Sequence, residues 1–389
     1  MFIAILGRQP EISVAELEAV FGKQNVAAYR NIATVNTASL DINRLGGTIK
    51  SGEIIQRLSA IDAQKNNFRL VSDYIIKHYH ELWKNSDHKI TLGISAYQLN
   101  ISPRDIQKIG LQLKILLKKD EVSLRLIPND QSTLSTATSH NNRLGLSSNK
   151  VELIIAKTSP IEIVIAESRG AQNITAYTRR DHEKPYRDAF IGMLPPKLAQ
   201  IMINLAHVEN GFILDPFCGT GTVLQEALLL GYDTYGTDFS TKMIDYSTKN
   251  LTWLKQKYPR LAEHKIRLEE ADAIDHKWDN PHQISAVVSE VYLGQPFSAP
   301  PSPEKLEQVR RQCNHITSSF LENIRPQLAS STILCLAVPA WLNKDGSFTY
   351  LPLVRNLEKL GYQLADHRPL LYHRENQVVA RQLLVLSIK

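Results

Sequence analysis

Short apolar runs alternate with amphipathic helical patterns along most of the chain. Apolar or alternating runs occupy 122–127, 152–156, 161–166 and 284–288, and runs of this length are typical of strands that are buried on one or both faces. A helical pattern starts at Ser102, where a serine, a proline and an acid three residues after the serine are typical of a helix N-terminus. The alternation of the two patterns predicts an α/β protein.

The segment 211–226 combines an apolar strand, a turn with two glycines and the start of an amphipathic helix. Gly219 and Gly221 carry no Cβ, so the chain can turn sharply and a ligand can approach the backbone N–H groups at the helix start. The spacing is neither the GxGxxG of dinucleotide sites nor the Gly-Lys-Ser/Thr of phosphate loops. Because the strand ends on Asp215, the pattern favours a cationic or zwitterionic cofactor. S-adenosylmethionine, which carries an ammonium and a sulfonium, fits this requirement.

Two further acids follow predicted strands. Asp238 ends a strand over 234–238, about 20 residues after the turn, which is the distance at which an acid binds ribose hydroxyls in doubly wound folds. Asp272 follows the run 266–268 and is placed to bind the adenine amino group. Acids at strand ends are commonly solvated, and Asp215 alone could cap the helix, but the three acids in this order beside the glycine turn favour the ligand role. The predicted cofactor-binding residues are Asp215, Phe217, Gly219, Thr220, Gly221, Asp238 and Asp272.

Residues 215–221, Asp-Pro-Phe-Cys-Gly-Thr-Gly, resemble the signature of class I methyltransferases that carry a THUMP domain. They are most similar to the archaeal and eukaryotic tRNA guanosine N2-methyltransferases that act on position 10 of tRNA. The resemblance extends through 180–188 and 192–199 and includes residues 4–13, so it covers nearly the whole chain. It implies S-adenosylmethionine as the cofactor and an α/β fold with a class I (Rossmann-like) methyltransferase domain built on a seven-stranded sheet. The implied domains are ferredoxin-like over 1–83, THUMP-like and RNA-binding over 84–170, a linker over 171–195 and the methyltransferase domain over 196–389.

The net charge of +6 is concentrated in the middle of the chain. It divides into +1 for 1–83, +5 for 84–190 and 0 for 191–389. A basic segment beside a neutral one suits a polyanion that is held by one domain while another does chemistry, although a soluble surface explains the surplus equally well. In the family, the THUMP domain recognises the tRNA acceptor end. The candidate RNA-binding residues are Lys108, Lys114, Lys118, Lys119, Arg125, Arg143 and Lys150.

The turn after the strand at 284–288 departs from the family pattern. Relatives that methylate exocyclic amines place Asp-Pro-Pro-Tyr here, whereas this chain has Ser289, Glu290, Val291 and Tyr292. Such an amine is a poor nucleophile because its lone pair is delocalised, so acceptors for its N–H bonds are the chemistry required. Aligning the following glycine puts Glu290 in the place of the aspartate, and aligning the tyrosine puts Ser289 there. We prefer Glu290 because it keeps a carboxylate, and we assign Tyr292 to stacking on the base.

The three cysteines, Cys218, Cys313 and Cys335, are scattered and odd in number, which favours a reducing compartment, and no apolar run is long enough for a membrane span. We therefore expect a cytoplasmic enzyme that forms N2-methylguanosine in tRNA without a metal. The family's eukaryotic members also suggest a small activator subunit as a partner. Two alternatives stay open: a methyltransferase for an amine of another RNA or of DNA, and a catalytically degenerate tRNA-binding factor.

Overall fold

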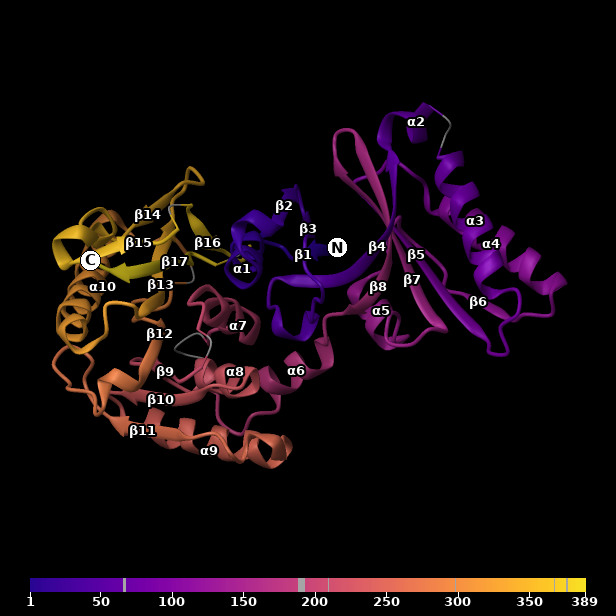
Figure 1. Cartoon of the computed structure of the whole chain (residues 1–389). Helices are drawn as coiled ribbons and strands as arrows, with labels where there is room; N and C mark the ends of the chain where they lie inside the picture. The colour runs from indigo at the N-terminus through magenta and orange to yellow at the C-terminus, as the bar shows by residue number, and fades with distance from the viewer. Residues whose placement is uncertain (66–67, 188–192, 209, 298, 367, 376) are drawn as a thin grey trace. The chain divides into compact units, whose positions relative to one another are not determined.

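The computed structural model describes residues 1–389 apart from 66–67, 188–192, 209, 298, 367 and 376. Within the described residues the chain forms two compact units, Met1–Ala176 and Tyr177–Lys389. Both contain a mixed sheet with helices packed on it (Figure 1), so the predicted α/β class is confirmed.

Unit 1 is built on one eight-stranded sheet. Its strands are β1 (Phe2–Leu6), β2 (Val26–Tyr29), β3 (Ile32–Val35), β4 (Thr48–Ser59), β5 (Ile90–Tyr97), β6 (Leu124–Leu126), β7 (Lys150–Ser159) and β8 (Glu162–Ala171). Their order is β2-β3-β1-β4-β8-β7-β5-β6. Its helices are α1 (Pro10–Phe21), α2 (Ala60–Lys65), α3 (Arg69–Trp83), α4 (Pro103–Lys119) and α5 (Thr136–Asn141).

The long strand β4 joins the two halves of this sheet. It pairs with β1 on one side and, along most of its length, with β8 on the other. Helices α3 and α4, which lie side by side in Figure 1, share one apolar cluster that includes Tyr79, Trp83 and Leu113. Sheet and core therefore both continue across the predicted boundary at residue 83. The division into ferredoxin-like and THUMP-like domains stays a prediction.

Helix α4 begins as the sequence predicts. Ser102 is its N-cap, and the serine hydroxyl accepts a hydrogen bond from the Asp105 N–H. Its apolar side chains Ile106, Ile109 and Leu113 are buried against the sheet. Leu117 continues this buried face, because it lies four residues after Leu113 on the same side of the helix.

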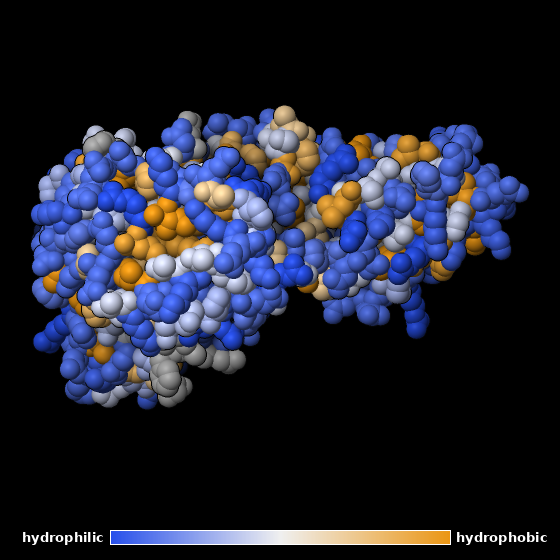
Figure 2. Space-filling view, turned by 90° about the horizontal axis from the view of Figure 1, so that it is seen from below, coloured by the Kyte–Doolittle hydropathy of each residue, from blue (hydrophilic) through white to orange (hydrophobic). Residues whose placement is uncertain are grey.

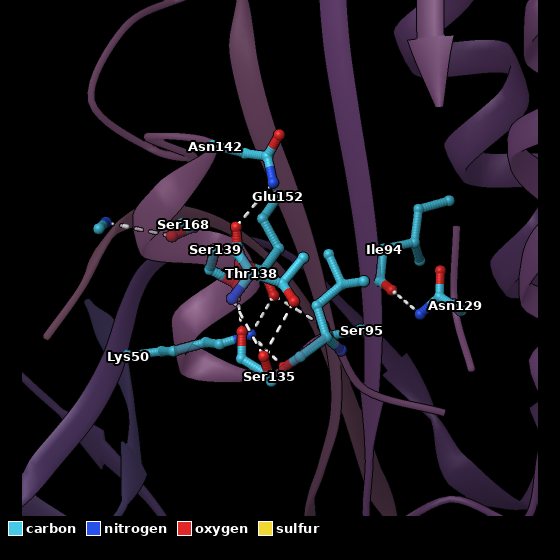
Figure 3. Close-up of polar contacts among 12 residues, drawn as sticks. Lys50, Ile94, Ser95, Asn129, Ser135, Thr138, Ser139, Asn142, Glu152 and Ser168 are labelled. Atoms are coloured by element: carbon cyan, nitrogen blue, oxygen red, sulfur yellow. Dashed lines mark hydrogen bonds and ion pairs between the residues drawn. The ribbon is translucent and has the colours of Figure 1, made fainter. Parts of the chain in front are cut away.

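A buried ion pair fastens the segment before α5 to the sheet of unit 1 (Figure 3). Lys50 on β4 and Glu152 on β7 are both fully buried, and their Nζ and Oε1 atoms are 2.5 Å apart. Ser95 donates to the same carboxylate oxygen at 2.6 Å, and Lys50 also donates to the Leu134 carbonyl at 2.8 Å. The pair thus links two strands to the segment that leads into α5.

Unit 2 carries a nine-stranded sheet. Its strands are β9 (Phe212–Asp215), β10 (Asp233–Asp238), β11 (Ile266–Glu270), β12 (Ile284–Glu290), β13 (Ile333–Leu342), β14 (Phe348–Tyr350), β15 (Tyr362–Leu364), β16 (Leu370–Tyr372) and β17 (Val379–Ile388). Seven of them follow the order β11-β10-β9-β12-β13-β17-β15, with β17 antiparallel to β13. The sheet therefore has nine strands where seven were expected, because the short strands β14 and β16 also pair with β13 and β17.

The helices of unit 2 are α6 (Ile174–His182, which begins at the end of unit 1), α7 (Pro196–Leu205), α8 (Thr222–Leu230), α9 (Thr241–Lys257) and α10 (Pro303–Ile324). One apolar cluster packs α10 on the strands through Phe320 and Cys313, and a separate one packs α8 and α9 through Leu224 and Leu254. Two separate clusters are what a sheet with helices on both faces requires. The predicted linker contains α6, and its residues 188–192 lie outside the described part of the chain.

Candidate active site

The carboxyl ends of four parallel strands open into one cleft in unit 2. Strand β9 lies between β10 and β12, so the order of the sheet reverses there, and ligands bind at such a switch point in open α/β sheets. The cleft has a volume of about 530 Å³. All seven predicted cofactor residues except Gly221 line it, together with Glu290 and Tyr292 from the turn after β12. On the face shown in Figure 2 the surface is mostly hydrophilic, with apolar side chains gathered in a restricted area at the left, within unit 2.

The glycine turn adopts the left-handed backbone that its sequence predicts. Gly219 has φ of +51° and Gly221 has φ of +82°. A Cβ on Gly219 would project into open space, so the backbone itself forms this wall of the cleft. Two side chains of helix α9 stabilise the turn: Ser247 donates to the Gly219 carbonyl at 2.8 Å, and Asn250 donates to the Thr220 carbonyl at 2.9 Å.

Two buried carboxylates stand at the ends of β9 and β10. Asp215 is 2% exposed and accepts hydrogen bonds from the Ser289 hydroxyl at 2.6 Å and the Phe217 N–H at 3.3 Å. Burial raises the pKa of Asp215 to about 7, and the neighbouring acids Asp238 and Glu290 add to that rise. Asp238 accepts from the Gly219 N–H at 2.9 Å, and burial raises its pKa as well. A buried site with several acids favours a cationic ligand, because a cation relieves their mutual repulsion.

The other predicted cofactor residues take different places around the cleft. Asp272 follows β11 and is exposed, with its carboxylate accepting from the Ile274 N–H at 3.2 Å. Phe217 packs edge-on against Phe320 with ring centroids 5.2 Å apart. Phe239, directly after Asp238, lines the cleft and is 77% exposed. Sequence reasoning missed Phe239, although its place beside the acid that ends β10 was a usable signal.

The structure separates the two candidates for the catalytic acceptor. Ser289 is fully buried, does not line the cleft, and turns its hydroxyl to Asp215. Glu290 does line it and forms an ion pair with Arg381 of β17. Burial raises the pKa of Glu290, and the Arg381 guanidinium opposes that rise. Tyr292 lines the cleft and is 38% exposed. The geometry therefore favours Glu290 over Ser289, while the roles themselves stay predictions.

The segment leading into the domain contributes two further buried cations. Arg180 of α6 forms a two-pronged ion pair with Glu226 of α8, with N···O distances of 2.6 and 3.1 Å. Lys184 donates to the hydroxyls of Thr220 and Thr222. Sequence reasoning treated this segment as a linker, because its partners lie about 40 residues further along the chain.

The candidate RNA-binding residues of unit 1 lie on two faces of the sheet. Lys108, Lys114, Lys118 and Lys119 are exposed on α4, which packs on the face that holds Leu92 and Leu124. Arg125 and Lys150 both pair in register with Thr91, which is the neighbour of Leu92. Successive side chains in a strand point to opposite faces, so these two belong to the face away from α4. Arg143, just after α5, is exposed.

The strand order, the glycine turn and the cleft at the switch point define unit 2 as a class I, Rossmann-like methyltransferase fold. The family model N6_N4_Mtase, described as DNA methylase, matches residues 56–249. The chain is 34% identical over 167 residues to a tRNA (guanine(10)-N2)-dimethyltransferase of Methanothermobacter thermautotrophicus, and this match covers 43% of this chain and 44% of that protein. It is 37% identical over 107 residues to the enzyme of that name from Methanocaldococcus jannaschii, covering 24% and 30%. The predicted resemblance to tRNA guanosine-10 methyltransferases is therefore confirmed over the matched part of the chain, and the THUMP domain stays a prediction.

The matching segments span less than half the length of these relatives. Among solved structures, ribosomal protein L11 methylase from Lactobacillus delbrueckii subsp. bulgaricus matches with a TM-score of 0.34 and 15% identity, covering 50% of this chain and 78% of that one. The strand order of unit 2 defines the fold. No helix in the described part of the chain is long and apolar enough to cross a membrane.

Proposed function

We propose that this protein is an S-adenosylmethionine-dependent tRNA methyltransferase that methylates the exocyclic N2 of guanosine 10. The observation that carries the proposal is the cleft at the switch point, where a glycine turn and buried acids meet a carboxylate and a tyrosine from the turn after β12. The names of the relatives support tRNA and guanine as the substrate.

The polar groups that line the cleft fit S-adenosylmethionine. The buried acids Asp215 and Asp238 favour its cationic groups, the bare backbone at Gly219 leaves room for close approach, and Asp272 is available to the adenine. Bound there, S-adenosylmethionine supplies an electrophilic methyl group. The protein's own task is then to orient and activate the amine that accepts it.

Glu290 is the residue we assign to that task. Its carboxylate accepts a hydrogen bond from the guanine amine, which returns electron density to nitrogen. The new N–C bond forms as the bond between the methyl carbon and the sulfonium sulfur breaks, and the electron pair of that bond stays on sulfur. The amine must then lose one proton, and we assign the same carboxylate to take it. Arg381 favours the charged form of Glu290 by its ion pair, and the exposed ring of Tyr292 is available to stack on the base.

We further propose tRNA as the partner of unit 1 and the cytoplasm as the location. The exposed basic residues on α4 support the first proposal because Lys and Arg neutralise backbone phosphates. The three buried, unpaired cysteines agree with a reducing compartment. A small activator subunit stays an expectation from the family alone.

Transfer of labelled methyl groups to unmodified tRNA and to double-stranded DNA, followed by nucleoside analysis, tests the proposal. We expect N2-methylguanosine, or its dimethylated form, in tRNA only. The match to the DNA methylase family supports the second candidate, and label in adenine or cytosine of DNA would establish it. Tight tRNA binding without any methyl transfer would instead show a degenerate binding factor.

A further inference from the structure

Lys184 is a buried cation without a carboxylate to bind. The residue is 3% exposed, and its ammonium donates to the hydroxyl oxygens of Thr220 at 3.3 Å and Thr222 at 3.0 Å. The nearest acid on α8, Glu226, is already bound by Arg180. Among the described residues, no ion pair reaches Lys184. A buried ammonium usually needs an anion in contact, whereas the carboxylates of Asp181 and Glu226 act on Lys184 only from a distance. This arrangement therefore lacks an anion in direct contact.

The two threonines connect this lysine to the cleft. Both line the cleft, whereas Lys184 does not. Each Oγ1 accepts a hydrogen bond from the ammonium, and so each hydroxyl hydrogen remains to be donated elsewhere. No acceptor for these two hydroxyls exists among the described residues. Helix α8 starts at Thr222, and the positive end of its dipole adds to the charge of the lysine.

The rest of the cleft has the opposite charge. Its lining includes the acids Asp215, Asp238, Asp272 and Glu290, and one lysine, Lys242. These acids suit the sulfonium and ammonium of the methyl donor but repel the carboxylate of its amino-acid arm. That carboxylate therefore requires a local donor group, and the hydroxyls of Thr220 and Thr222 are such a group.

We propose that Thr220 and Thr222 bind the carboxylate of S-adenosylmethionine, with Lys184 as the positioning residue that orients both hydroxyls and supplies the balancing charge. The inference rests on the proposed cofactor but requires no RNA and no turnover. Burial lowers the pKa of Lys184 to about 8, as expected for a buried ammonium that has no anion in contact.

The test compares two ligands that differ only in this carboxylate, S-adenosylmethionine and its decarboxylated form, by calorimetry on the full chain. Lys184→Met and Thr222→Val should each weaken S-adenosylmethionine about 10- to 100-fold, the loss expected for a hydrogen bond to a charged group. Affinity for the decarboxylated ligand should change less than about threefold. Lys197→Met is the matched control, because Lys197 is a partly buried lysine of α7 that lies over the Tyr177 ring, and it should leave both affinities unchanged.

Equal loss of both ligands, or loss of neither, in Lys184→Met and Thr222→Val would overturn the inference while leaving the proposed function standing. If Lys184→Met does not fold, Thr222→Val alone tests the inference. Valine has nearly the same shape as threonine and carries a methyl group in place of the hydroxyl. Wild-type protein that binds neither ligand would instead overturn the proposed function, and this inference with it.

Discussion

Variants of the Glu290–Arg381 ion pair distinguish a catalytic role of the Glu290 carboxylate from a purely structural one. Either residue can be replaced alone, or both can be replaced together. The two side chains are 16% and 7% exposed, so the values for interior pairs apply rather than the 0–1 kcal/mol of surface pairs. Glu290→Gln leaves the charge of Arg381 buried without a counter-charge and should cost about 3–5 kcal/mol of unfolding free energy. Methyl transfer should fall about 10²- to 10³-fold, the usual cost of losing one charge-stabilising group.

The double variant Glu290→Gln with Arg381→Met decides between the two roles. It contains no buried charge at this place, so urea unfolding should show most of the lost stability restored. Single-turnover methyl transfer should remain as low as in Glu290→Gln. A double variant that recovers activity together with stability would refute the reasoning, because the pair would then serve the fold alone.

The single variant Arg381→Met adds a test by pH. Without the guanidinium, nothing opposes the rise that burial causes in the pKa of Glu290. More of the carboxylate should then be neutral at a given pH than in the wild type, and the pH at which activity increases should shift upward. A pH profile identical to that of the wild type would contradict this assignment.

Three further outcomes are expected. Because the pKa of Asp215 is raised to about 7, its charged fraction increases as the pH rises through this value. Calorimetry should therefore show that affinity for S-adenosylmethionine rises between pH 6 and 8 in the wild type and rises less steeply in Asp215→Asn. Parallel profiles would refute this. Gly219→Ala should weaken that affinity more than about tenfold. Gly346 also has a positive φ and open space at its Cβ position, so Gly346→Ala should cost only about 1–2 kcal/mol of stability and leave the affinity unchanged. Equal affinities in the two variants would contradict the close approach of the ligand at Gly219. Lys50→Met should cost about 3–5 kcal/mol of unfolding free energy, because it leaves Glu152 buried without a counter-charge. Adding Glu152→Leu should recover most of this loss. If Lys50→Met is as stable as the wild type in urea unfolding, the buried pair contributes nothing to stability.

The parts of the site that were predictable lie close together in the sequence. The strand, the glycine turn and Asp215 form one continuous segment, and Asp238 follows at the spacing that a strand–helix–strand unit imposes. The turn after β12 could be located because its strand is a short, mostly apolar run. In each case a local pattern specifies the backbone, and the backbone places the side chain.

The remaining features depend on pairings between distant segments. Arg381 reaches Glu290 across 91 residues, and this neighbourhood exists only because β17 lies antiparallel to β13. The single sheet of unit 1 depends likewise on the pairing of β4 with β8, whose partners are more than 100 residues apart. Lys184 carried no local signal, since a lysine in a polar segment is normally solvated. Such contacts follow from topology, which no local pattern encodes.

The most direct test of the central claim uses two transcripts of one tRNA that differ only at position 10, with guanosine in one and inosine in the other. Inosine keeps the purine ring and its carbonyl but lacks the exocyclic amine. The account predicts stoichiometric methyl transfer to the guanosine transcript and none to the inosine transcript. Equal methylation of both transcripts, or of neither, would contradict it.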